Sequence, residues 1–167
     1  CTGYMQNQKL IPDCKIDIKD FWVTVTENSK KNNIDPTLSY MHLLEEKMYQ
    51  AKVEISKKKL NQYGKELILF PGVGDWFTRI KSFGKKNNVE IEHYIISSGL
   101  TDMIEGCDFS NQLNKIYACE YIYKNGRGIW PKLSVNYSNK VQYLYRIHKG
   151  AFDVSDQEGV NEKKYYG

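Results

Sequence analysis

The feature that most constrains the fold is an alternation of short apolar runs with amphipathic stretches after Gly64. The strand-like runs are residues 67–70, 89–96 and 116–123, and the helical patterns are residues 75–85, 101–105 and 138–149. Strands that alternate with helices form parallel pairs joined by right-handed crossovers. The alternation therefore predicts an α/β fold with a parallel sheet.

The apolar spacing within two of these helices predicts which faces are buried. The first stripe consists of Trp76, Phe77, Ile80 and Phe83, and the second of Val141, Leu144, Tyr145 and His148. We expect both stripes to face the core. Asn125-Gly126, which follows the third predicted strand, is a strong turn signal.

The residues before Gly64 carry helical patterns without strand-like runs. One helix is predicted over residues 17–32. A second begins at Asp35-Pro36, where Asp caps the helix and Pro fits its first turn. The second helix carries an apolar seam made of Met41, Leu44, Met48, Ala51 and Ile55. This seam fits a coiled-coil dimer or packing against the preceding helix, and its length of about two heptads favours a helical hairpin within the chain.

Charge and cysteine usage exclude several classes of protein. The chain has 24 Lys and Arg against 20 Asp and Glu, a net charge of +4 that is spread evenly. Its basic cluster, Lys57–Lys59, is typical of a solvated helix face, so we predict no nucleic-acid binding. No apolar run approaches the roughly 18 residues of a membrane span. The four cysteines have neither C-x-x-C spacing nor the density of a disulfide scaffold, which favours a reducing cytoplasm.

Two motifs that suggest binding sites have simpler explanations. Gly72-Val73-Gly74 follows a predicted strand, but the dinucleotide fingerprint needs glycine where this chain has Phe77, so a tight turn is favoured. Asp153 and Asp156 could hold a metal ion, yet beside Gly159 they are more typical of turn and cap chemistry. We predict no metal site within this chain.

A third motif, Ser97-Ser98-Gly99, lies where a predicted strand ends and a helix begins. Ligands bind at the carboxyl ends of parallel strands, and a hydroxyl with the first N–H groups of a helix forms an anion site. Lys140 lies in the first turn of a later helix, where the macrodipole disfavours a cation by roughly 0.3–1 kcal/mol unless an anion is close. Lys132 is an alternative basic residue, and a plain serine cap with a solvated lysine would also fit the pattern.

The order of these motifs resembles that of the haloacid dehalogenase-like hydrolases, in particular their phosphoserine-phosphatase-like branch. The resemblance covers about residues 67–150 and rests on Leu67–Val73, Tyr94–Leu100 and Asn139-Lys140. Ser97 matches the second motif of the family, a strand that ends in Ser or Thr. Lys140 matches the third motif, a lysine at a helix start, better than Lys132 does.

This resemblance implies a fold and an activity. The fold is a Rossmann-like three-layer core with a parallel sheet, partly formed by residues 67–167, and residues 1–66 are a small inserted helical cap. The activity is magnesium-dependent hydrolysis of a small phosphorylated metabolite through an aspartyl-phosphate. In such an enzyme Ser97, Ser98, Gly99 and Lys140 would bind phosphate. Lys140 would also stabilise charge on the nucleophile.

The chain departs from the family pattern in two motifs. It contains no D-x-D-x-[T/V] stretch, which carries the nucleophile and general acid, and no acidic G-D-x-x-x-D-like stretch, which helps to hold magnesium. We therefore expect this chain alone to be inactive, with the Mg²⁺ ligands of a full-length parent lying outside it. The alternative is a non-catalytic anion-binding or interaction module with the same fold.

The missing first motif also predicts an incomplete sheet. In the family its strand pairs with the strand that ends at Ser97, so its absence would leave an apolar edge unpaired. We expect this chain to be a piece of a longer protein, or a second chain in an oligomer to cover the edge. A mature lipoprotein also begins with cysteine, but a removed start explains Cys1 more simply. A solvated edge strand at residues 89–96 would argue against the resemblance.

Overall fold

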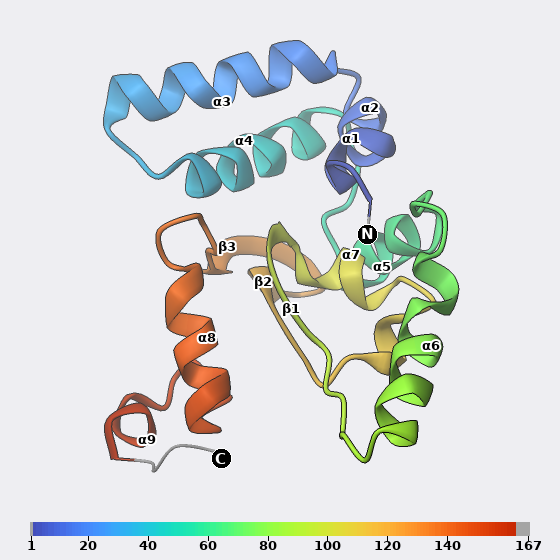
Figure 1. The fold of residues 1–167 in the computed structure, drawn as a ribbon. Coiled ribbons are helices and arrows are strands. Elements are labelled where there is room, and N and C mark those ends of the chain that lie inside the picture. The colour runs from blue at the N-terminus through green and yellow to red at the C-terminus, as the bar shows by residue number, and fades with distance from the viewer. Residues whose placement is uncertain (1, 163–167) are drawn as a thin grey trace.

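The computed structural model describes residues 2–162 and shows helices combined with a small sheet (Figure 1). The amino-terminal helices are α1 (Met5–Gln8), α2 (Leu10–Asp13), α3 (Ile18–Asn32) and α4 (Pro36–Gln50). The middle elements are α5 (Lys57–Lys65), α6 (Val73–Lys86), β1 (Tyr94–Leu100), α7 (Thr101–Glu105), a 3-10 turn at Ser110–Gln112, β2 (Lys115–Lys124) and β3 (Arg127–Leu133). The last elements are α8 (Lys140–Lys149) and α9 (Gln157–Glu162). The mixed α/β class is confirmed.

The sheet is mixed rather than parallel. Its strand order is β1-β2-β3, with β1 and β2 parallel and β2 and β3 antiparallel. Asn125 and Gly126 form the β2–β3 turn with φ of 51° and 79°, which matches the twist that a tight hairpin needs. The turn prediction is confirmed. The parallel-sheet prediction is wrong for β3, because the hairpin returns the chain beside β2.

Two of the predicted strands also differ from the structure. Residues 67–70 form neither a helix nor a strand. The backbone of Ile68 is bonded instead by the side chains of Thr2 and Gln8, and Gln8 Oε1 accepts from Ile68 N at 2.7 Å. The strand predicted over residues 89–96 begins only at Tyr94 and continues to Leu100. The Ser-Ser-Gly motif therefore lies inside the strand rather than after it.

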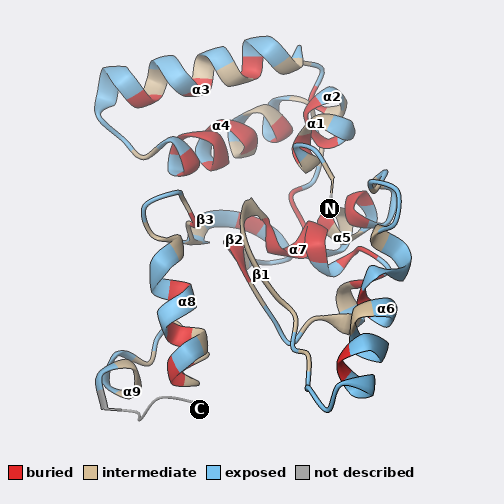
Figure 2. Cartoon of the chain, viewed as in Figure 1, coloured by how far each residue is buried: buried red, intermediate tan, exposed pale blue. Residues whose placement is uncertain are grey.

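The helical hairpin formed by α3 and α4 is confirmed. Asp17 caps α3 by accepting from Lys19 N at 2.8 Å, and Asp35 caps α4 by accepting from Thr37 N at 2.9 Å. The apolar side chains that the two helices bury include Phe21 and Val25 of α3 and Met41, Leu44 and Met48 of α4 (Figure 2). The helix α4 ends at Gln50, so the predicted seam is shorter than its apolar spacing suggested.

Two groups of buried side chains cover opposite faces of β2. The larger group joins α2, α3 and α4 to the face of β2 that carries Tyr117 and Cys119, and it includes Tyr143 of α8. The smaller group joins α6 and the 3-10 region to Ala118 on the other face. Since neighbouring residues of a strand point to opposite faces, α6 and α8 lie on opposite sides of the sheet (Figure 1).

The burial predicted for α8 is wrong. Val141, Leu144, Tyr145 and His148 are exposed, and the buried residues are Tyr143, Arg146 and Lys149. The helix is oriented by Tyr143, whose ring lies 4.8 Å from that of Tyr117, and by Arg146, which donates to the carbonyl of Asp153 at 2.7 Å. None of the helices described between residues 2 and 162 is long and apolar enough to cross a membrane.

The stripe predicted for α6 is only partly correct. Phe77 is buried against Phe109, with stacked ring centroids 5.2 Å apart, but Trp76 and Phe83 of the same stripe are exposed. In contrast, α5 and α7 cross so closely that a Cβ on Gly64 would lie 2.0 Å from the carbonyl oxygen of Met103. Glycine at position 64 therefore allows the two backbones to touch.

Candidate functional site

The Ser-Ser-Gly motif forms a bulge near the carboxyl end of β1. Ile96 pairs with Tyr117 and Leu100 pairs with Cys119, so four steps along β1 correspond to two steps along β2. Within the bulge Ser97 Oγ accepts from Gly99 N at 3.0 Å. Because that bond uses Ser97 Oγ as an acceptor, the hydroxyl hydrogen stays available for a ligand. Bulges re-aim side chains and are common next to active sites.

Glycine at position 99 is required by a close approach of Met5. A Cβ at this position would lie 2.8 Å from Met5 Sδ. The carbonyl of Ser98 accepts from Tyr40 Oη at 2.7 Å, and Tyr40 belongs to α4. The bulge is thus held by the amino-terminal helices, although Met5 and Tyr40 were not predicted as neighbours of this motif.

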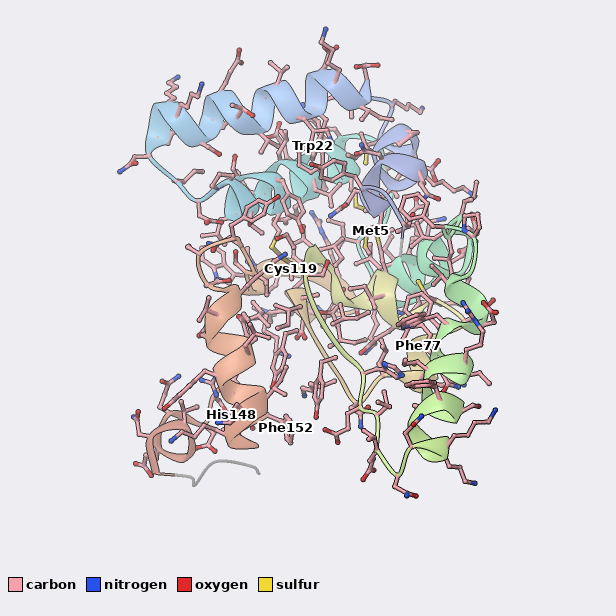
Figure 3. All side chains as sticks on the ribbon, viewed as in Figure 1. Met5, Trp22, Phe77, Cys119, His148 and Phe152 are labelled. Atoms are coloured by element: carbon pink, nitrogen blue, oxygen red, sulfur yellow. The ribbon has the colours of Figure 1, made fainter. Side chains whose placement is uncertain are left out.

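The helix that carries Lys140 runs antiparallel to β1. At one end, Cys119 Sγ donates to Ser98 O at 3.5 Å and accepts from Val135 N at 3.4 Å, just before α8 begins. At the other end, the ring of Phe152, just after α8, stacks on Tyr94 with 6.1 Å between centroids. Figure 3 shows Cys119 and Phe152 at the two ends of this pair. The amino end of α8 and the Ser97 bulge therefore lie at the same end of the sheet.

A network of amide side chains fixes the turn before Lys140. Asn136 Oδ1 accepts from Asn139 N at 2.9 Å, and Asn139 Oδ1 accepts from Asn136 N at 2.8 Å. Asn136 Nδ2 also donates to Asp35 Oδ2 at 2.5 Å, which connects the turn to the start of α4. Lys140 is half-buried, and its Nζ lies 5.5 Å from the ring centroid of Tyr137, a side chain that is 91% exposed.

The structure separates the two lysines that the sequence left as alternatives. Lys132 Nζ forms an ion pair with Glu120 at 2.5 Å. Lys140 has no carboxylate partner among residues 2–162, and no hydrogen bond or ion pair within that range joins it to Ser97–Gly99. Lys140 is therefore the cation that an incoming anion could meet without displacing an ion pair.

The helix that follows the bulge gives less support to an anion site than the sequence suggested. The helix α7 has only five residues and no side-chain cap, so its macrodipole is small. Thr101, its first residue, has a buried Oγ1 without a hydrogen-bond partner in the described structure. An anion at this end of the sheet would depend mainly on Ser97 and Lys140.

A buried carboxylate next to the bulge was missed by sequence reasoning. Asp102 Oδ2 accepts from Tyr123 Oη at 2.5 Å, and Lys57 Nζ lies 3.7 Å from Asp102 Oδ1 and 2.9 Å from Glu105. Burial raises the pKa of the Asp102 carboxyl above its ordinary value, while Tyr123 and Lys57 act in the opposite direction. Tyr123, Lys57 and Asp102 come from β2, α5 and α7, and no spacing in the sequence predicts that they lie together.

The described residues do not fit a magnesium site. Between residues 2 and 162, no group of three or more His, Cys, Asp or Glu side chains could hold a metal ion. Asp153 Oδ1 accepts from Ser155 N at 2.9 Å and from Ser155 Oγ at 2.8 Å, as in a turn. Asp156 Oδ1 accepts from Gly159 N at 2.6 Å. We assign no metal ligand and derive no metal-dependent step from these residues.

Comparison with known proteins leaves the family of the chain open. No family model matches it, and no solved structure matches it. An uncharacterized protein from Borreliella burgdorferi (strain ATCC 35210 / DSM 4680 / CIP 102532 / B31) is 29% identical over an alignment of 187 positions. The alignment covers 97% of this chain and 65% of that protein, so the chain spans just under two thirds of its relative's length.

Proposed function

We propose that this chain is part of a phosphohydrolase of the haloacid dehalogenase-like type, acting on a small phosphorylated metabolite. In this proposal β1, β2, α6 and α8 belong to a Rossmann-like three-layer core within residues 67–167, and residues 1–66, with α1–α5, form its cap. The observation that carries the proposal is the antiparallel packing of α8 on β1, which brings Lys140 to the same end of the sheet as the Ser97 bulge.

Each residue would have a defined role toward the phosphate group. Ser97 Oγ, already accepting from Gly99 N, would donate its hydroxyl hydrogen to a phosphoryl oxygen. Lys140 would offset the negative charge, and a bound anion would in turn relieve the unfavourable position of a cation at a helix start. Ser98 and Gly99 would supply the backbone around the same oxygen atoms. The nucleophile and any Mg²⁺ ligands would come from sequence outside this chain.

Anion binding by this chain tests the site without requiring catalysis. We expect inorganic phosphate to shift the amide signals of Ser97–Gly99 and Lys140 in NMR spectra. Lys140→Ala should weaken binding at least tenfold, because a hydrogen bond to a charged group contributes roughly 1.5–3 kcal/mol. Ser97→Ala should weaken binding less. Lys132→Ala is the matched control, since Lys132 is already paired with Glu120.

The same titration can contradict the assignment. Equal phosphate affinity of the Lys140→Ala variant and the unchanged chain would show that Lys140 is not part of the site. A loss caused by Lys132→Ala instead would move the site to β3. Hydrolysis is tested separately, by assaying the full-length gene product with p-nitrophenyl phosphate and magnesium. We expect activity in that protein, a loss of at least a hundredfold on Lys140→Ala, and none in the 167-residue chain.

The second candidate is a non-catalytic anion-binding or interaction module. The observation that favours it is the exposed apolar surface of α8, where Val141 is 68% and Leu144 is 59% exposed. A gene product that binds phosphate at Ser97 and Lys140 but hydrolyses nothing would support this candidate over the enzyme.

For either candidate we propose the cytoplasm as the location. Cys14, Cys107 and Cys119 are free and buried, as in a reducing compartment. Burial raises the pKa of the Cys14 and Cys107 thiols to about 11, which keeps them as unreactive thiols.

A further inference from the structure

A series of hydrogen bonds runs from α4 into the bulge of β1. Tyr40 Oη of α4 donates to Ser98 O at 2.7 Å. The carbonyl of Ser98 and the N–H of Gly99 belong to one planar peptide unit, so the direction of one fixes the direction of the other. This N–H donates to Ser97 Oγ at 3.0 Å. The orientation of the Ser97 hydroxyl therefore depends on a side chain of a distant helix.

The side chain of Tyr40 is itself held in place. It is 4% exposed, and its ring centroid lies 5.8 Å from that of Trp22 on α3. The buried side chain of Gln6 forms a further hydrogen bond with Tyr40. Burial raises the pKa of the Tyr40 hydroxyl well above its ordinary value, so the group remains a donor at neutral pH. A side chain fixed by packing and hydrogen bonds can orient the group to which it donates.

Other support for the peptide unit of the bulge is weak. The ladder between β1 and β2 passes from the pair of Ile96 directly to the pair of Leu100, so it does not include residues 97–99. Cys119 Sγ also donates to Ser98 O, at 3.5 Å, but a thiol is a weak donor. Tyr40 is therefore the strong donor that sets the direction of the Ser98 carbonyl.

We propose that Tyr40 is a positioning residue of the anion site: its hydrogen bond to Ser98 holds the peptide unit that orients the Ser97 hydroxyl toward phosphate. This inference rests on the phosphate site proposed above, and it adds to that site a residue from the helical part of the chain. Tyr40 acts through the bulge and does not itself contact the phosphate.

The same helix also reaches the other half of the site. Asp35, which caps α4, accepts from Asn136 in the turn before Lys140. Asp35 and Tyr40 lie about 7.5 Å apart along the helix axis, because each residue of a helix adds about 1.5 Å. Figure 1 shows α4 lying near the end of β1 and the start of α8. The position of α4 thus bears on both the Ser97 and the Lys140 sides of the site.

The chain offers a closely matched control for Tyr40. Tyr121 of β2 is 3% exposed, and its Oη donates to Met41 O of α4 at 2.8 Å. Both tyrosines join α4 to the sheet by one buried hydroxyl, but the bond of Tyr40 ends on the bulge and that of Tyr121 ends on the helix. Tyr40→Phe and Tyr121→Phe each remove one oxygen atom, so we expect similar losses of stability in urea denaturation.

Phosphate affinity separates a positioning role from a purely structural one. We expect inorganic phosphate to bind the Tyr40→Phe variant roughly three- to tenfold more weakly than the unchanged chain, the range expected when one neutral hydrogen bond is lost. The Tyr121→Phe variant should keep the affinity of the unchanged chain. NMR titration of the 167-residue chain and the two variants measures the three affinities.

The amide of Gly99 provides a second readout that needs no ligand. Hydrogen exchange at this amide should be roughly three- to tenfold faster in the Tyr40→Phe variant than in the Tyr121→Phe variant, because a hydrogen bond protects an amide and the bond to Ser97 Oγ is then less well aligned. Amides of β3 should exchange equally in the two variants and are the internal control.

Two results would overturn the role of Tyr40. One is equal phosphate affinity of the two phenylalanine variants, and the other is equal exchange at Gly99 in both. Failure of the unchanged chain to bind phosphate is a different result, because it would overturn the proposed function. Exchange at Gly99 would then still decide whether Tyr40 orients the bulge.

Discussion

The helices of the α3–α4 hairpin and the two helices on either side of the sheet, α6 and α8, all carry amphipathic patterns but differ in burial. In the hairpin, Met41, Leu44 and Met48 are buried as their spacing predicts. In α8, Val141 and Leu144 are exposed although their spacing is just as regular. The difference teaches that regular apolar spacing does not settle which face of a helix is buried. In α8 the contact of Tyr143 with Tyr117 decides it.

The largest difference is expected between two leucine-to-alanine substitutions, one in the α3–α4 hairpin and one in α8. Leu44→Ala should lower the free energy of unfolding by about 2–5 kcal/mol, because Leu44 is fully buried and leaves a cavity. Leu144→Ala should change it by less than about 0.5 kcal/mol, because the side chain is already in water. Urea denaturation of the 167-residue chain measures both. Comparable losses in the two variants would mean that Leu144 is buried in solution, which would contradict the difference in burial between the hairpin and α8.

The next effect concerns how closely the backbone is approached at the α5–α7 crossing and in the first turn of α6. Gly64→Ala should cost about 3 kcal/mol, since its Cβ would overlap the backbone of α7. Gly74→Ala should instead stabilise the chain by roughly 0.5–1 kcal/mol, since nothing lies within 4 Å of its Cβ in the first turn of α6. Thermal unfolding measures both. A tolerated alanine at position 64 would contradict the α5–α7 crossing.

A smaller effect is expected at Asp102, the buried carboxylate of α7. Tyr123→Phe removes the hydrogen bond to Asp102 and should cost about 1–3 kcal/mol at neutral pH. It should also raise the pKa of the Asp102 carboxyl further, because Tyr123 is one of the groups that lower it. Denaturation at pH 7, with the carbon chemical shift of Asp102 followed against pH, measures the two effects.

The pH dependence of Asp102→Asn is the most discriminating of these measurements. Burial raises the pKa of Asp102 in the folded protein, so the folded state binds this proton more tightly than the unfolded state does. Ionisation of Asp102 therefore lowers stability as pH rises from the ordinary value of about 4 through the raised pKa. We expect the variant to gain stability relative to the unchanged chain over that window. A difference that grows toward low pH instead would contradict the burial.

Much of the fold could be predicted because its signals are local. Asp17 and Asp35 accept hydrogen bonds from amides two or three residues ahead, and Asn125-Gly126 adopts the positive φ of its turn. The strand β3 was not predicted, because Gly128 and Pro131 make it a poor strand by composition. The strand predicted over residues 67–70 is absent for the opposite reason. They have the composition of a strand, but side chains bond the Ile68 backbone where a ladder was expected.

The candidate site, like the fold, was only partly predictable from the sequence. The sequence alone pointed to Ser97 and Lys140, but it could not show that they lie at one end of the sheet. That arrangement depends on Cys119, which contacts both Ser98 and Val135. The Asp102–Tyr123 pair was missed because its members are 21 residues apart and no periodicity connects them.

The sequence by itself determined the helix caps, the hairpin turn and the amphipathic stripes, because each depends on atoms only a few residues apart along the chain. Only the tertiary structure decided which face of α8 is buried and which polar groups meet at the end of β1. Those outcomes depend on contacts between distant segments, such as Tyr117 with Tyr143, and a one-dimensional pattern does not contain them.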